Sequence, residues 1–179
     1  MPYASPRKTA PRPLDPASLR ALALHYVSRY ATTRHKLLRY LRRKVQERNW
    51  DADSPADFDD LAEEFVRLGY VNDEAFAQNR TSSLLRRGYG ASRVRADLQA
   101  AGISADRIGD HTRLEPDVRM AAAQTFARRK RWSAFARDEP GKKARNRALA
   151  AMLRGGHDYE ISRMVIDGLA RNEFGTEEL

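Results

Sequence analysis

The chain has 179 residues and carries 33 Lys and Arg against 24 Asp and Glu, which gives a net charge of +9 at pH 7. It contains no cysteine, so disulfides, thiolate zinc sites and thiol nucleophiles are excluded. No segment approaches the roughly 18 consecutive apolar residues of a membrane-spanning helix, and no apolar run resembles a secretory signal. We therefore expect a cytoplasmic protein that has no membrane partner.

The charge is distributed unevenly along the chain. Residues 1–50 hold 12 basic and 2 acidic residues, 51–80 hold 2 basic and 9 acidic, and 116–155 hold 11 basic and 3 acidic. One interpretation is that acidic and basic helices neutralise each other within the fold. The other is that the basic blocks bind a polyanion or an acidic protein surface, and the overall surplus of positive charge favours such a partner.

The first 70 residues predict a basic arm followed by three helices. Residues 1–14 contain four of the eight prolines and no apolar periodicity, which predicts a disordered basic arm. Asp15 and Pro16 are typical of a helix start, and Thr33 predicts the cap of a second helix. A third helix is predicted to open at Ser54-Pro55 and to end near Gly69.

Six further helices are predicted in the remainder of the chain. Asn72 or Asp73 begins a fourth helix that stops at Gly88, and a short fifth carries Leu98 inward and ends at Gly102. The later helices are predicted to start at Ser104, at Pro116, after a break at Pro140-Gly141, and at Asp158. No window alternates apolar and polar residues as a strand does, so the predicted fold class is all-α.

The nine predicted helices fall into three sets of three. Leu98-x-x-x-Gly102 corresponds to Met152-x-x-x-Gly156, and more loosely to Leu41-x-x-x-Val45, although short amphipathic helices can also resemble each other by chance. This spacing predicts tandem three-helix repeats that form an elongated curved array. The predicted domains are repeats at 15–70, 71–115 and 116–171, followed by an acidic tail at 172–179.

Two segments carry a family resemblance. "LGYVNDEAFAQNR" followed by "RRGYGASRVRADLQAAGI" resembles the RecX family of regulatory proteins, and the resemblance extends over about residues 19–170. The matching positions are Leu68, Gly69, Tyr70, Asp73, Phe76, Ala77, Gly88, Gly90, Arg93, Val94, Leu98, Gly102 and Ile103. The chain departs from the family pattern at Asn72, Val45 and His157, where aspartate, glycine and a large apolar residue are usual.

These motif residues are predicted to build the scaffold. Gly88, Gly90 and Gly102 are interpreted as turn and cap residues, and Phe76 and Leu98 as core residues. Asp73 is interpreted as the cap of the fourth helix and not as an acid or a base. Function is then expected on the polar faces of the helices.

The resemblance implies a regulator of another protein. A RecX-like chain is expected to bind the RecA recombinase filament on single-stranded DNA and to inhibit its recombinase, ATPase and co-protease activities. Such a protein modulates DNA repair and the SOS response, acts as a monomer and needs no cofactor.

The residues themselves give no support to catalysis. The four histidines are scattered without a second ligand at metal-binding spacing, and the adjacent Glu63 and Glu64 side chains diverge on one helix. We expect no catalytic site, no metal site and no enzyme activity.

Three basic clusters are the candidate contacts with RecA or DNA, chosen by charge. They are Arg39, Arg42, Arg43 and Lys44; Arg128, Arg129, Lys130 and Arg131; and Lys142, Lys143, Arg145 and Arg147. The alternatives are an ordinary solvated face for the first cluster and a contribution to the helix dipole for the second. Trp132 could stack on a base, although a packing role is more common.

A stand-alone DNA-binding protein is the alternative function. The linker "NWDADS" is too long for a helix-turn-helix, and acidic residues on the third helix would repel phosphate. The tighter fifth and sixth helices carry Asp106 and Asp110 on the second of the pair. Sequence-specific readout is therefore not expected, whereas non-specific binding to single-stranded and double-stranded DNA remains open.

Overall fold

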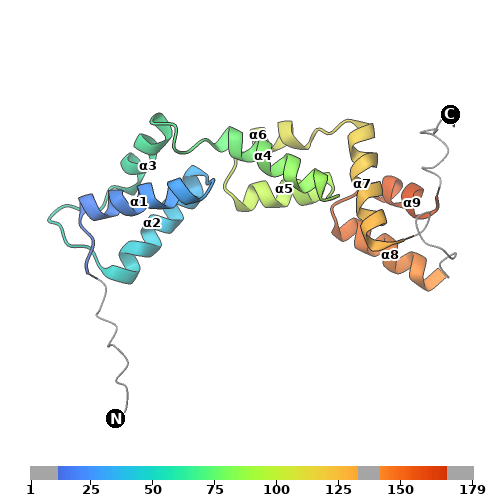
Figure 1. Cartoon of the computed structure of the whole chain (residues 1–179), viewed down its shortest axis with the longest axis horizontal. Helices are drawn as coiled ribbons and strands as arrows, with labels where there is room; N and C mark the ends of the chain where they lie inside the picture. The colour runs from blue at the N-terminus through green and yellow to red at the C-terminus, as the bar shows by residue number, and fades with distance from the viewer. Residues whose placement is uncertain (1–11, 133–141, 169–179) are drawn as a thin grey trace, which may run out of the picture. The chain divides into compact units, whose positions relative to one another are not determined.

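The computed structural model describes residues 12–132 and 142–168, and these form an all-α fold as predicted (Figure 1). Over those ranges there are nine helices and no strand, apart from an isolated bridge between Leu14 and Trp50. None of these helices has the length and apolarity that crossing a membrane requires. The chain divides into two compact units, Met1–Asp73 and Glu74–Leu179, and each is described by itself.

The first unit contains α1 (Pro16–Arg29), α2 (Arg34–Arg48) and α3 (Phe58–Arg67). The two predicted caps are confirmed, because Asp15 accepts a hydrogen bond from the Ser18 amide and Thr33 accepts one from the Lys36 amide. The predicted start of the third helix at Ser54-Pro55 is wrong. Helix α3 begins after Asp57, whose carboxylate accepts a hydrogen bond from the Asp60 amide.

The core of the first unit is built from α1, α2, α3 and the segment just before α1. Leu37, Leu41 and Phe65 are almost completely buried, and Leu14 is buried with them. The Leu14 amide donates to the Asn49 carbonyl at 3.0 Å, and the Leu14 carbonyl accepts from the Asp51 amide at 2.8 Å. Assigning Leu14 to a disordered arm is therefore wrong, because its side chain is needed in the core. Residues 1–11 of the predicted arm lie outside the described residues.

The second unit comprises α4 (Asp73–Arg86, which starts at the last residue of the first unit), α5 (Ala91–Ala100), α6 (Ala105–Thr112), α7 (Pro116–Lys130), α8 (Lys142–Arg154) and α9 (Tyr159–Ile166). The predicted starts at Pro116 and Asp158 are confirmed, and the Asp158 carboxylate accepts from the Ile161 amide. Ser104 occupies the N-cap position of α6 without a side-chain capping bond. The predicted break at Pro140-Gly141 and the tail at 172–179 lie outside the described residues.

Several helices end in a left-handed glycine, as the sequence predicts. Gly88 and Gly102 have φ angles of 81° and 78°, and in each case the following amide donates to the carbonyl five residues earlier. Gly69 ends α3 in the same way. The looser correspondence of Val45 to these helix-ending glycines is wrong, since Val45 lies inside α2. This helix ends at Arg48, with Asn49 as its C-cap.

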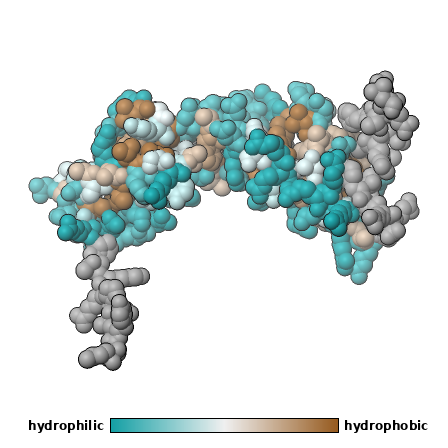
Figure 2. Space-filling model, in the orientation of Figure 1, coloured by the Kyte–Doolittle hydropathy of each residue, from teal (hydrophilic) through white to brown (hydrophobic). Residues whose placement is uncertain are grey.

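Three hydrophobic clusters follow one another along the chain, and each draws on three successive helices. The tandem three-helix organisation is therefore confirmed, while the domain boundaries at 15–70, 71–115 and 116–171 remain predictions. Some large apolar side chains are exposed, among them Tyr30, Val66, Val118 and Leu153. Figure 2 shows that the face in view is mostly hydrophilic, in keeping with the small number of exposed large apolar side chains.

Candidate functional site

The acidic helix α3 neutralises part of the basic surface formed by α1 and α2. Arg34 donates to Asp59 at 2.8 Å and to Glu63 at 2.7 Å, and Arg20 pairs with Glu64. Arg42 lies 3.4 Å from Asp59. The interpretation of charge segregation as compensation within the fold is therefore correct for these residues. Exposed ion pairs of this kind each contribute only about 0–1 kcal/mol to stability.

The remaining α2 candidates keep most of their charge available. Arg43 and Lys44 share a single partner, Glu47, which lies one turn further along the helix. The side chain of Arg39 is exposed and forms no ion pair with any residue in the described ranges. This surface of the first unit therefore carries positive charge that its own acidic residues do not cancel.

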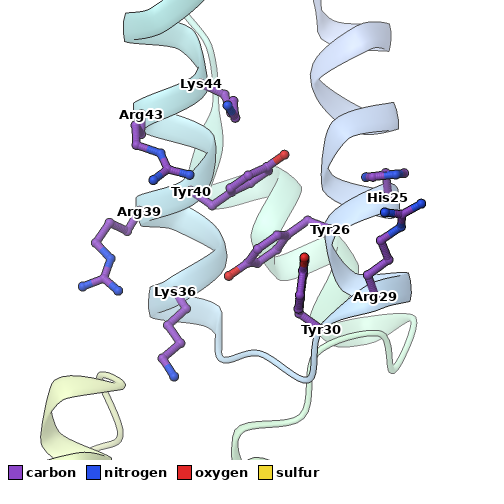
Figure 3. Close-up of a pocket in the computed structure, with 9 residues that line it drawn as sticks. All are labelled: His25, Tyr26, Arg29, Tyr30, Lys36, Arg39, Tyr40, Arg43 and Lys44. Carbon is purple, nitrogen blue, oxygen red and sulfur yellow. The ribbon is translucent and has the colours of Figure 1, made fainter.

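Three tyrosines that were not among the predicted site residues lie beside these cations. The rings of Tyr26 on α1 and Tyr40 on α2 stack with centroids 4.2 Å apart and planes 10° from parallel (Figure 3). Tyr30 lies 5.5 Å from Tyr26, and the charged groups of Arg43 and Lys44 lie over the Tyr40 ring at 5.8 and 5.9 Å. Tyr40 among the Arg and Lys residues of α2, together with Tyr26 and Tyr30 at the end of α1, is the sequence signal that could have revealed this site.

The basic cluster at the end of α7 has a partly structural role. Arg131 ends the helix in the left-handed conformation with a φ of 57°. Arg129 donates to the carbonyl oxygen of Arg87 at 2.6 Å, which ties this turn to the end of α4. Arg128 and Lys130 are exposed, and the position of all four cations also suits the negative end of the helix dipole.

Trp132 is a packing residue in this structure. Its indole ring lies 5.9 Å from the Phe126 ring, and it packs against the cluster of buried residues formed by α7, α8 and α9. Its backbone amide donates to the carbonyl of Ala127. This confirms the packing interpretation over the base-stacking one.

The basic cluster at the start of α8 is exposed at three of its four positions. Lys142, Lys143 and Arg147 are exposed and line one surface pocket, and they form no ion pair within the described part of the chain. Arg145 differs, because its guanidinium donates two hydrogen bonds to Asp167, at 2.7 and 2.8 Å. These bonds lower the pKa of the Asp167 carboxyl. Arg145 thus links α8 to the residue that follows α9.

Two motif glycines of the second unit, Gly88 and Gly90, lie in close contact with residues 155–157. We call this contact the glycine joint (Gly88, Gly90, Gly155, Gly156 and His157). The Gly90 amide donates to the Gly155 carbonyl at 2.9 Å. A Cβ at Gly90 would lie 2.3 Å from the Gly156 oxygen, and one at Gly88 would lie 2.6 Å from a backbone nitrogen of α7. Gly90 is the N-cap of α5, which fits its interpretation as a cap residue, but its φ of −86° suits any residue, and it is the close approach that requires glycine here.

The side chain of His157 adds a hydrogen bond to the glycine joint. Its side chain is 7% exposed, and Nε2 donates to the Gly88 carbonyl oxygen at 2.9 Å. Burial lowers the pKa of His157, which keeps the ring neutral, while the bond to Gly88 and the nearby Asp158 charge oppose this shift. A histidine at this position therefore adds a hydrogen bond that an apolar side chain could not supply.

Among the other motif residues, Leu98 and Phe76 take their predicted place in the core. Leu98 is buried, and Phe76 is half-buried against the same cluster. Arg93 is exposed, and its guanidinium lies 5.7 Å from the Tyr89 ring. Asp73 does not fit the predicted role of capping its own helix, because its carboxylate accepts a hydrogen bond from the Arg34 amide at the start of α2. In the described ranges, no group of three His, Asp or Glu residues could hold a metal ion.

These observations define an all-α protein of three-helix units that presents basic surfaces to solvent. Residues 72–110 match the family model for the second three-helix domain of RecX. The Regulatory protein RecX of Myxococcus xanthus is 35% identical over 170 residues, which cover 88% of this chain and 88% of the relative. The chain therefore belongs to the RecX family of regulatory proteins.

Other relatives and solved structures agree with this assignment. The Regulatory protein RecX of Haemophilus influenzae is 30% identical over 99 residues, covering 55% of this chain and 62% of the relative. A crystal structure of RecX from Lactobacillus salivarius superposes with a TM-score of 0.65 at 19% identity, covering 86% of this chain and 96% of that one. A second crystal structure of a regulatory protein RecX gives a TM-score of 0.65 at 20% identity, covering 84% and 71%. At such low identity, the solved structures support the fold.

Proposed function

We propose that this protein binds the RecA recombinase filament in the cytoplasm and inhibits its recombinase, ATPase and co-protease activities, thereby modulating DNA repair and the SOS response. Membership of the RecX family of regulatory proteins is the observation that carries the proposal. We further propose that it acts as a monomer and without catalysis of its own.

The uncompensated basic surfaces support this function physically. Arg39 on α2 and Lys143 and Arg147 on α8 are exposed and form no ion pair across the described residues. A nucleoprotein filament presents phosphates and acidic side chains, so cations on separate three-helix units can each make a weak contact with it. Several weak contacts on one chain raise the overall affinity through effective concentration.

RecA ATP hydrolysis on single-stranded DNA, titrated with this protein, tests the proposal. We expect inhibition at well below one copy per RecA protomer, because binding to a filament affects many protomers at once. If the steady-state rate is unchanged even at equimolar protein, the proposal is wrong.

A pair of charge-matched variants tests the α8 surface. We expect the double change Lys143→Glu and Arg147→Glu to raise the concentration for half-inhibition about tenfold, because both side chains are exposed cations without an ion-pair partner among the described residues. The control is Arg107→Glu with Arg113→Glu, which changes the net charge equally at exposed positions in and after α6. Equal inhibition by the two double variants would remove α8 from the interface.

The alternative is a stand-alone protein that binds DNA non-specifically. The tyrosine and cation cluster between α1 and α2 favours some direct contact with nucleic acid. Under this alternative, inhibition of RecA would require enough protein to cover the DNA and would disappear when excess single-stranded DNA is added. Inhibition that survives excess DNA supports filament binding.

A further inference from the structure

A pocket of about 510 Å³ lies between α1 and α2 in the first unit (Figure 3). Its lining combines three tyrosines with six Arg, Lys and His residues, and none of the nine lining residues is acidic. They are His25, Tyr26, Arg29, Tyr30, Lys36, Arg39, Tyr40, Arg43 and Lys44. This composition is unusual for a plain solvated face, where charges of both signs normally alternate.

The tyrosines form an organised platform. Tyr26 and Tyr40 stack on each other, and in Figure 3 their rings point toward one another from the two helices. Tyr30 extends the platform outward with 58% of its surface exposed, and its backbone amide is fixed by a bond to the Tyr26 carbonyl. None of the three phenol hydroxyls forms a hydrogen bond with a described residue. Tyr30 therefore offers an exposed aromatic ring beside the ring of Tyr26.

The cations around the platform are available for an anionic ligand. Arg29 and Arg39 are exposed and form no ion pair with the described residues, while Arg43 and Lys44 share the single carboxylate of Glu47. Like charges gathered on one surface repel one another, and an incoming anion relieves this repulsion. The pocket thus combines an aromatic face with an anion-binding rim.

We propose that this pocket binds an unpaired nucleotide of a single-stranded DNA segment, with the base stacked on Tyr30 and the neighbouring phosphates held by Arg29 and Arg39. A base and its phosphates match an aromatic face beside a cationic rim. An acidic protein segment needs the cations but has no use for the tyrosine platform. The inference deepens the proposed function by naming the partner of one surface, and binding measured without RecA tests it separately.

The fluorescence anisotropy of a labelled oligothymidylate provides the first test. We expect Tyr30→Ala to weaken binding about fivefold or more, the lower end of what loss of one base-stacking ring causes. Tyr30→Phe should bind like the parent, because it keeps the ring. Tyr159→Ala is the matched control, since Tyr159 is 55% exposed on α9, outside this pocket. Equal affinity of the Tyr30→Ala and Tyr159→Ala variants would overturn the proposal.

An abasic oligonucleotide of the same length separates the base from the backbone. The parent protein should bind it about fivefold more weakly than oligothymidylate, whereas Tyr30→Ala should bind the two about equally. A fivefold loss for Tyr30→Ala on the abasic strand as well would overturn base stacking. Displacement of the DNA by polyglutamate from the parent but not from Tyr30→Ala would assign the pocket to an acidic protein. Binding of thymidine monophosphate as tightly as the strand would assign the pocket to a free nucleotide.

The phosphate contact has its own measurement. Arg39→Gln should reduce the slope of log affinity against log salt by about 0.7, the value expected for one phosphate contact to a single strand. Arg107→Gln on α6 serves as the control and should leave the slope unchanged. If the parent inhibits RecA but all variants bind DNA alike, only the pocket assignment fails. If Tyr30→Ala loses DNA binding but the parent does not inhibit RecA, only the proposed function fails.

Discussion

The pocket between α1 and α2 and the glycine joint differ in how they use side chains. In the pocket, large aromatic and cationic groups lie at the surface, and Tyr30 and Arg39 have few contacts that the fold requires. In the joint, backbone atoms make the closest contacts, and two chain segments more than sixty residues apart meet through Gly90 and Gly156.

The difference separates binding from folding in this protein. The joint is specified by close backbone contacts that tolerate no added atom, so changes there should lower the free energy of unfolding. The pocket is specified by exposed groups, so changes there should lower affinity and leave stability intact. Measurements of stability at paired positions in the joint and in the pocket therefore test this difference.

The largest loss of stability is expected for Gly90→Ala. The new Cβ would lie 2.3 Å from the Gly156 carbonyl oxygen, and the backbone of both residues is hydrogen-bonded in place. We expect the free energy of unfolding in urea to fall by about 3 kcal/mol. Gly109→Ala is the control, since an added Cβ there meets nothing within 4 Å inside α6, and it should raise stability by about 0.5 kcal/mol. Similar effects of the two changes would contradict the joint.

His157 should make stability depend on pH. Because burial lowers its pKa below the usual 6.5, the unfolded chain takes up this proton at a higher pH than the folded chain does. The contribution to stability is then complete above pH 6.5 and is lost as the pH falls, with a slope of at most about 1.4 kcal/mol per pH unit. Urea unfolding at a series of pH values measures this slope. His157→Gln should reduce the slope of stability against pH, whereas His25→Gln, at an exposed position, should not. A slope like that of the parent in His157→Gln would exclude His157 as its cause.

A smaller effect is expected at the cap of α9. Asp158→Ala removes the acceptor for the Ile161 amide and the partner of Arg119, so we expect a loss of about 1 kcal/mol in thermal or urea unfolding. Ser104→Ala provides the comparison, because Ser104 holds the same position in α6 without a side-chain bond. It should change stability by less than about 0.5 kcal/mol. A cost at Ser104 as large as at Asp158 would show that capping does not explain the loss.

The smallest effect on stability is expected in the pocket itself. Arg39→Gln should change the free energy of unfolding by less than about 0.5 kcal/mol, since the side chain is exposed and makes no ion pair within the described ranges. The same variant should nevertheless bind single-stranded DNA more weakly. A clear loss of stability would mean that Arg39 belongs to the fold and not to a binding surface.

Much of the fold could be predicted because helix ends are local features. The caps at Asp15, Thr33 and Asp158 and the glycine stops at Gly88 and Gly102 involve hydrogen bonds that span only a few residues. The start of α3 was missed because Ser54-Pro55 and Asp57 are both suitable starts. Local sequence does not decide between two adequate caps, whereas packing of the helix does.

The candidate site could be predicted only in part. Clusters of Arg and Lys are visible in the sequence, but the carboxylates that pair with them are not. The sequence therefore did not predict that Arg145 pairs with Asp167 or that Arg42 pairs with Asp59. Tyr26 and Tyr30 follow the same helical periodicity as the buried Leu19 and Ala23 of α1. Their exposure depends on how α1 and α2 pack, with Tyr40 as the opposing ring.

The amino-acid sequence was sufficient to predict the all-α class, most helix ends and the family, because periodicity, capping and the two motifs act over short stretches of chain. The folded structure was needed to explain why Gly90 must be glycine, why His157 is buried and neutral, and which cations have no ion-pair partner among the described residues. Those properties depend on contacts between residues far apart in the chain, such as the approach of Gly90 to Gly156, and no local pattern encodes them.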